Sequence, residues 1–88
     1  MTQPVVTIYL SDWCPYCQRA LGLLGQKPVV IKEFNVDDDS KWREEMIART
    51  NRRTVPQIFI GDKHVGGCDE LYALDRSGEL DRLIQGAG

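Results

Sequence analysis

The chain has 88 residues, with 11 basic and 13 acidic side chains, one histidine and three cysteines. This length predicts one folded domain, residues 1–88, because two separate cores would each need more chain. The net charge of −2 is too balanced for a nucleic-acid-binding protein or for a polybasic membrane-binding surface. No apolar run approaches the roughly 20 residues of a membrane span, and the N-terminal residues lack a signal-peptide pattern. We therefore expect a soluble, cytoplasmic protein.

The first half of the chain alternates between predicted strands and predicted helices. The apolar, β-branched run over residues 5–10 predicts a buried strand. A helix over residues 15–24 follows, because apolar side chains recur there at helical spacing and a proline occupies its first position. A second strand is predicted within residues 29–36. A cluster of aspartates then favours the start of a second helix, which extends to about residue 49.

The second half predicts a hairpin followed by two helical stretches. A third strand over residues 57–60 is joined by a Gly61-Asp62 turn to a fourth strand that begins at His64. Helical patterns follow around residues 71–74 and 80–84. The order β-α-β-α-β-β-α predicts parallel pairing of the first two strands and an antiparallel pair at the end. We therefore predict a thioredoxin-like α/β fold, a mixed four-stranded sheet with helices on both faces.

Two of the three cysteines lie in a Cys14-Pro15-Tyr16-Cys17 motif, where a predicted strand ends and a helix begins. Unpaired backbone N–H groups and the positive end of the helix dipole then point at the Cys14 sulfur, which favours its thiolate. Cys17 follows nearly one turn later on the apolar face, close enough to form a disulfide and more buried. The motif predicts a redox-active dithiol in which Cys14 attacks and Cys17 resolves the mixed disulfide.

A structural zinc site is the alternative chemistry for the same residues. Cys14, Cys17, His64 and Cys68 would supply four ligands of suitable type. However, the two pairs lie further apart than in common zinc motifs, and the first pair spans a strand–helix junction. We therefore expect no metal, and we expect His64 to be a solvent-facing strand residue without a catalytic role.

Three segments together resemble the signature segments of dithiol glutaredoxins of the bacterial type. They are Cys14–Cys17, Thr54-Val55-Pro56 and Gly66-Gly67-Cys68-Asp69, in the family's order and spacing, and the likeness covers essentially the whole chain. The resemblance implies a glutathione-dependent thiol–disulfide oxidoreductase that reduces protein disulfides and protein–glutathione mixed disulfides. It implies glutathione as electron donor, no permanently bound cofactor, and a monomer whose partners are glutathione and disulfide-containing or glutathionylated proteins.

The same resemblance implies how glutathione is bound. The Val55–Pro56 peptide is expected to be cis, leaving the backbone of Val55 open for pairing with the cysteine of glutathione. The start of the helix at Cys68 would hold the γ-glutamyl carboxylate, and Asp69 would meet the ammonium group. Either of two arginines would bind the glycine carboxylate, and Tyr16 would form a wall of the groove. The full expected set is Tyr16, Arg52, Arg53, Thr54, Val55, Pro56, Gly67, Cys68 and Asp69.

Simpler roles remain open for some of these residues. The two arginines could be ordinary loop charge, and Cys68 could be a small, inert residue of the core. Trp13, which is more familiar in thioredoxins, either forms an exposed contact surface or packs beside the active site. Where the family often has a lysine, this chain has Ser11 followed by Asp12. That change is expected to reduce both the stabilisation of the Cys14 thiolate and the affinity for glutathione.

Two further functions therefore stay as alternatives. One is a thioredoxin-like reductant that a flavoprotein reductase recycles in place of glutathione. The other is an iron–sulfur carrier, in which Cys14 from two chains and two glutathiones hold a cluster. Proline after the first cysteine is thought to disfavour the cluster.

Overall fold

A computed structural model describes residues 3–87 and confirms the predicted mixed four-stranded sheet. Its strands are β1 (Val5–Leu10), β2 (Val30–Asn35), β3 (Gln57–Ile60) and β4 (Lys63–Gly66). Its helices are α1 (Pro15–Leu24), α2 (Ser40–Thr50), α3 (Cys68–Ser77) and α4 (Glu79–Ala87). Every predicted element is present. The predicted ends of the second strand and the start of the fourth differ from the observed ends by one residue.

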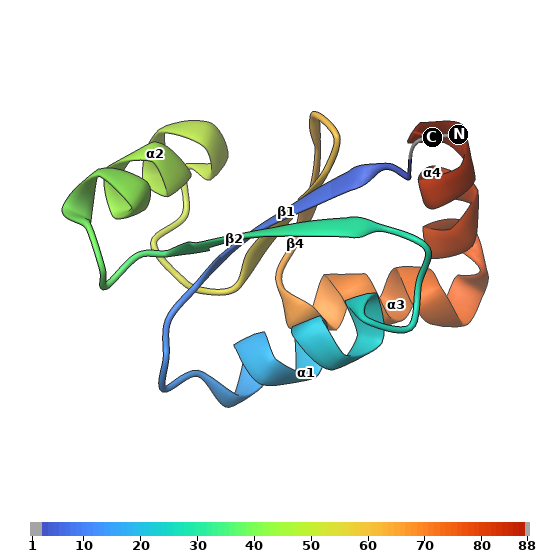
Figure 1. Ribbon diagram of the computed structural model, residues 1–88, viewed down its shortest axis with the longest axis horizontal. Helices are drawn as coiled ribbons and strands as arrows, with labels where there is room; N and C mark the ends of the chain where they lie inside the picture. Colours follow the sequence, from blue (N-terminus) through green and yellow to red (C-terminus); the bar gives the residue numbers. More distant parts are fainter. Residues whose placement is uncertain (1–2, 88) are drawn as a thin grey trace.

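The sheet has the strand order β2-β1-β3-β4. β1 and β2 are parallel, with Val5 opposite Val30, as the strand–helix–strand order predicted. β3 pairs with β1 and with β4 in antiparallel fashion, and the ladder to β4 is irregular between Ile58 and Phe59. α2 lies on one side of the sheet, and α1 and α3 lie on the other (Figure 1). Helices therefore cover both faces, as expected.

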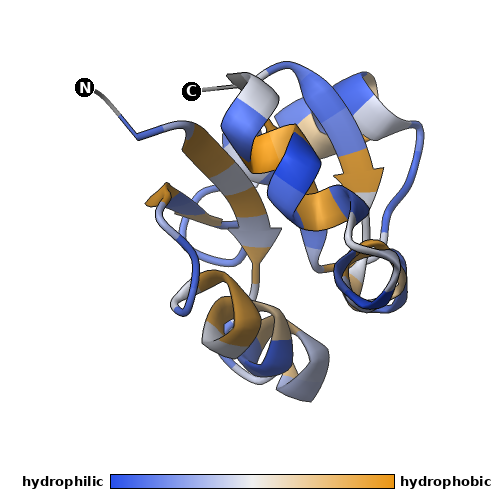
Figure 2. Ribbon diagram, turned by 90° about the vertical axis from the view of Figure 1, so that its right-hand side faces the viewer, coloured by the Kyte–Doolittle hydropathy of each residue, from blue (hydrophilic) through white to orange (hydrophobic). Residues whose placement is uncertain are grey.

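Side chains along β1 alternate between the two faces of the sheet, and each face has its own core. The larger core joins β1 and β3 to α1, α3 and α4. Along the helices that cover this core, hydrophobic and hydrophilic residues alternate, as they do in amphipathic helices (Figure 2). Its buried members are Val6, Ile8, Leu10, Cys17, Ala20, Leu23, Leu24, Ile58, Ile60, Cys68, Leu71, Leu80 and Ile84.

The smaller core lies under α2 and contains Tyr9, Val36, Met46 and Phe59. The buried hydroxyl of Tyr9 is fully paired: it donates to the Glu45 carboxylate at 2.5 Å and accepts from the Arg49 guanidinium at 2.8 Å. Burial, together with the Glu45 hydrogen bond, raises the pKa of Tyr9. The neutral phenol therefore ties α2 to the central strand.

Three chain segments bring the functional residues together. The loop after β1 leads into α1, and the loop before β3 passes close to it, because β1 and β3 are neighbours. α3 begins at Cys68, after Gly66 and the N-cap Gly67. Gly66 has φ +115°, a conformation that favours glycine, and a Cβ there would also lie 2.7 Å from the Glu70 carboxylate. Over residues 3–87, no helix has the length and apolar character needed to cross a membrane.

Candidate active site

Cys14 is the N-cap residue of α1, in an extended conformation with φ −117° and ψ 103°. Its sulfur accepts a hydrogen bond from the backbone N–H of Cys17 at 3.1 Å, and its thiol group faces the carbonyl oxygen of Val55 at 3.8 Å. Pro15 occupies the first helical position, where no N–H is needed. The sulfur is half-buried and lies at the N-terminal, positive end of the α1 dipole.

Cys17 is fully buried on the inner face of α1. Burial and, after it, the hydrogen bond with Cys14 raise the pKa of its thiol to about 12, against the effect of a backbone hydrogen bond with Ser11. Cys17 is therefore a thiol at neutral pH. The two sulfurs thus differ in the way the sequence predicted, with Cys14 accessible and Cys17 enclosed.

An open groove of about 170 Å³ lies between the loop that precedes β3 and the start of α3. The Val55–Pro56 peptide in this loop is cis, as expected. All the residues expected to bind glutathione line the groove except Arg53. The lining residues are Tyr16, Arg52, Thr54, Val55, Pro56, Gln57, Gly67, Cys68, Asp69 and Glu70. The structure thus brings together three segments that are distant in the sequence.

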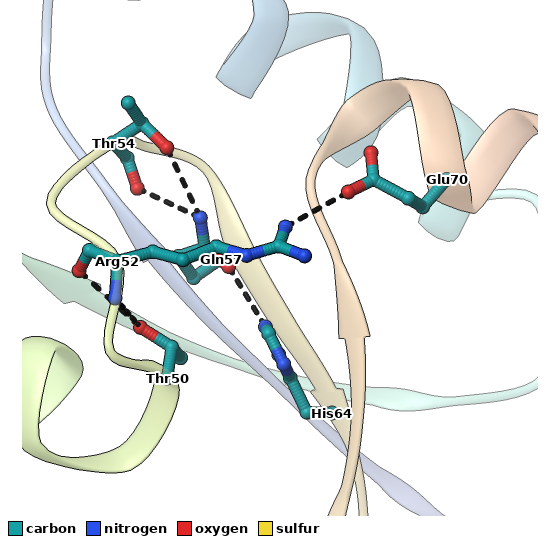
Figure 3. Close-up of polar contacts among 6 residues, drawn as sticks. All are labelled: Thr50, Arg52, Thr54, Gln57, His64 and Glu70. Atoms are coloured by element: carbon teal, nitrogen blue, oxygen red, sulfur yellow. Dashed lines mark hydrogen bonds and ion pairs between the residues drawn. The ribbon is translucent and has the colours of Figure 1, made fainter.

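Glu70, which the sequence reasoning did not select, forms an ion pair with Arg52 at 2.9 Å on this groove (Figure 3). The Arg52 hydrogen bond lowers the pKa of the Glu70 carboxyl against the effect of burial, and the backbone N–H groups of Glu70 and Gly67 lower it further. Gly67 is the N-cap of α3, so Glu70 occupies the N3 position, from which its carboxylate reaches back to the Gly67 N–H. The three-residue spacing from Gly67 to Glu70 was the sequence feature that could have indicated this role for Glu70.

Gln57 is the second lining residue that was missed, and it corrects the expectation for His64. The His64 ring is half-buried, not solvent-facing, and its Nε2 lies 2.8 Å from the Gln57 side-chain oxygen (Figure 3). Among residues 3–87, no three histidine, cysteine, aspartate or glutamate side chains are grouped to hold a metal ion. His64 therefore does not join the cysteines, and the four-ligand zinc set considered as an alternative is not assembled among these residues.

The remaining residues singled out from the sequence lie around the dithiol. Cys68 is 4% exposed, and burial raises the pKa of its thiol, so it packs in the core as well as touching the groove. Trp13 is 95% exposed and forms part of the surface beside Cys14. The Asp12 carboxylate accepts a hydrogen bond from the Asn35 amide at 2.7 Å, which ties it to the end of β2.

Comparison with known proteins then identifies the family. The glutaredoxin family model matches residues 6–65, which is more than half of the chain. The chain belongs to the glutaredoxin family. Glutaredoxin 3 of Escherichia coli is 54% identical to it over 80 residues, covering 91% of this chain and 96% of the relative. Membership of this family implies a glutathione-linked thiol redox function.

Solved glutaredoxin structures share the thioredoxin-like fold of this glutaredoxin. The solution structure of glutaredoxin from Brucella melitensis is 46% identical, with a TM-score of 0.81, and the match covers 96% of this chain and 91% of that one. The crystal structure of a buckwheat glutaredoxin–glutathione complex is 30% identical, with a TM-score of 0.86, covering 97% of this chain and 80% of that one. The predicted fold is confirmed over nearly the whole chain.

Proposed function

We propose that this glutaredoxin reduces protein–glutathione mixed disulfides and protein disulfides, acting as a monomer in the cytoplasm with glutathione as electron donor. The observation that carries the proposal is the placement of the Cys14 sulfur. The Cys14 sulfur caps α1 and accepts a hydrogen bond from the Cys17 N–H at 3.1 Å. It also faces the carbonyl oxygen of Val55, a residue that lines the groove. A reactive sulfur beside a groove that offers an arginine, backbone groups and a helix N-terminus suits thiol exchange on a small peptide.

With a glutathionylated protein, the Cys14 thiolate attacks the sulfur of the bound glutathione. The new bond joins Cys14 to glutathione, and the protein leaves as a thiolate that takes up a proton. A second glutathione thiolate then attacks the glutathione sulfur in that mixed disulfide. This step releases oxidised glutathione and restores the Cys14 thiolate. One half of that oxidised glutathione comes from the substrate, and the other half is the one free glutathione consumed as reductant.

With a protein disulfide, Cys14 first forms a mixed disulfide with one of the protein's sulfurs, and the other protein sulfur leaves as a thiolate. Cys17 then loses its proton and attacks the Cys14 sulfur, which releases the second protein thiol. The resulting Cys14–Cys17 disulfide is reduced by two glutathiones in succession. The position of Cys17 within the first turn of α1 supports its role as the resolving residue.

The groove offers a group for each part of glutathione. Arg52 supplies a cation for the glycine carboxylate, and the backbone of Val55 can pair with the cysteine residue. The start of α3 provides N–H groups for the γ-glutamyl carboxylate, and Asp69 can accept from the ammonium group. The buckwheat relative, whose structure was solved with glutathione, supports this choice of ligand.

The test is turnover of a glutathionylated peptide with millimolar glutathione, coupled to glutathione reductase and NADPH. We expect NADPH oxidation that depends on this protein and on both the peptide and glutathione. In a parallel reaction, a flavoprotein thioredoxin reductase replaces glutathione and its reductase. Turnover supported only by the flavoprotein would overturn the proposal in favour of a thioredoxin-like reductant.

A further inference from the structure

Gln57 carries a polar side chain at the start of the buried strand β3, and only 1% of its surface is exposed. Its amide nitrogen donates to the carbonyl oxygen of Thr54 at 3.0 Å and to the Thr54 hydroxyl at 3.2 Å. Its amide oxygen lies 2.8 Å from Nε2 of His64 (Figure 3). One buried amide thus joins the loop before β3 to strand β4.

These contacts determine the orientation of the amide and the tautomer of the histidine. The Thr54 carbonyl can only accept, so the nitrogen of Gln57 must face Thr54 and its oxygen must face His64. That oxygen in turn needs a donor, so the proton of the neutral His64 ring lies on Nε2. Each polar atom of this buried amide then has a partner of the correct kind.

The electrostatic surroundings keep the His64 ring neutral. Burial lowers its pKa, the charges of Arg52 and Arg49 lower it further, and the charge of Glu70 raises it. The ring also lies against Phe59, its neighbour across the β3–β4 ladder, with centroids 5.0 Å apart. His64 is therefore held in place both by stacking and by its hydrogen bond.

Thr54 and Gln57 flank Val55 and Pro56, so a hydrogen bond between the flanking residues holds the intervening backbone. Val55 is the residue whose carbonyl faces the Cys14 sulfur, and all four residues line the groove. We propose that Gln57 and His64 form a buried clamp that positions the Thr54–Val55 backbone and so determines how tightly the groove binds glutathione. The inference rests on the proposed function, and it makes Gln57 and His64 positioning residues.

Kinetics of two matched substitutions test the clamp. His64→Phe keeps an aromatic ring against Phe59 but removes the donor to Gln57, and Gln57→Leu removes the amide itself. For each variant we expect KM for a glutathionylated peptide to rise about fivefold to tenfold, with kcat changed less than about twofold. Lys63→Gln, an exposed neighbour on β4, should leave both constants unchanged. An unchanged KM in both clamp variants would overturn the proposal.

Rescue and coupling separate positioning from a general loss of stability. His64→Gln restores a side-chain N–H donor, so its KM should return to within about twofold of the unaltered value. The double variant Gln57→Leu with His64→Phe should have the KM of Gln57→Leu alone, because both act through one amide. Failure of the rescue, or additive effects in the double variant, would show that these residues act independently.

A measurement on the unaltered protein keeps the proposal falsifiable if the variants do not fold. Nitrogen-15 chemical shifts at pH 7 should show a neutral His64 ring protonated on Nε2, and the proton on Nδ1 would overturn the clamp. The outcomes also distinguish the two proposals. An unaltered protein without glutathione-dependent turnover contradicts the proposed function, whereas normal turnover with an unchanged KM in both His64→Phe and Gln57→Leu contradicts the clamp alone.

Discussion

The backbone N–H of Cys17 donates a hydrogen bond to the sulfur of Cys14 at 3.1 Å, while the thiol of Cys17 itself is fully buried. In the proposed mechanism, one residue therefore contacts the nucleophile through its backbone and provides the resolving group through its side chain. The two roles are chemically separate, because replacing the Cys17 side chain leaves its backbone N–H in place.

The first prediction concerns that separation. Cys14→Ser should reduce turnover of both glutathionylated and disulfide substrates to background, because the other cysteine sulfurs among residues 3–87 are buried. Cys17→Ser should retain turnover of the glutathionylated peptide within about threefold and lose reduction of protein disulfides at least tenfold. Both activities are measured in the same glutathione-coupled assay. Equal losses of deglutathionylation in the two variants would contradict the assigned roles.

The second prediction concerns the pH dependence of the resolving step. Burial, the largest cause, together with the hydrogen bond to Cys14 raises the pKa of Cys17 to about 12, and of these causes burial does not depend on a free Cys14 sulfur. The fraction of Cys17 that is ionised, and with it the rate of the resolving step, should therefore increase about tenfold per pH unit from pH 6 to 9, without reaching a plateau. The measurement is release of a chromophoric thiol from a preformed mixed disulfide on Cys14, with Cys17→Ser as control. A plateau below pH 9 would contradict the raised pKa.

The fold and the position of the dithiol were predictable because they depend on local patterns. The apolar run of β1, the proline at the first position of α1 and the turn between β3 and β4 are all visible in consecutive residues. The parallel β1–β2 pair followed from the intervening helix. By contrast, the antiparallel pairing of β1 with β3 joins strands with α1, β2 and α2 between them, and periodicity alone did not specify it.

The residues that were missed depend on such pairings. Gln57 looks out of place at the start of an apolar strand, and its role becomes visible only when the β3–β4 register brings His64 to its amide oxygen. In the sequence, Glu70 resembles any charged residue on an exposed helix face. Only the fold shows that the loop before β3 places Arg52 beside it. A sequence shows that such residues are polar, but their partners come from tertiary structure.

The third prediction distinguishes two neighbouring arginines. Arg52 lines the groove and Arg53 does not, so Arg52→Gln should raise KM for the glutathionylated peptide about fivefold. Arg53→Gln removes the same charge one residue away and should change KM less than about twofold. The difference should shrink at 0.5 M salt, because the Arg52 side chain is 48% exposed and its charge is screened. Equal effects of the two substitutions would indicate general charge attraction in place of a specific contact.

The fourth prediction concerns acid stability at the same ion pair. The Arg52 hydrogen bond lowers the pKa of Glu70 in the folded state below the ordinary value of 4.5, so the folded protein favours the charged carboxylate. The resulting stabilisation is present above about pH 4.5 and is lost as the pH falls through the folded-state pKa. Because both side chains are nearly half exposed, at 48% and 46%, it should not exceed about 1 kcal/mol.

Urea unfolding of the unaltered protein and of Glu70→Gln at pH 7, 5, 4 and 3 measures this contribution. The variant should be less stable at pH 7, and the difference in free energy of unfolding should approach zero by about pH 3, where the carboxyl is protonated in both states. Glu44→Gln removes an exposed carboxylate of α2 that forms no ion pair with the described residues, so it should show a smaller difference. A difference for Glu70→Gln that stays constant or grows towards acid would contradict the stabilising role of the Arg52–Glu70 pair, since the sign of that pH dependence follows directly from the lowered pKa.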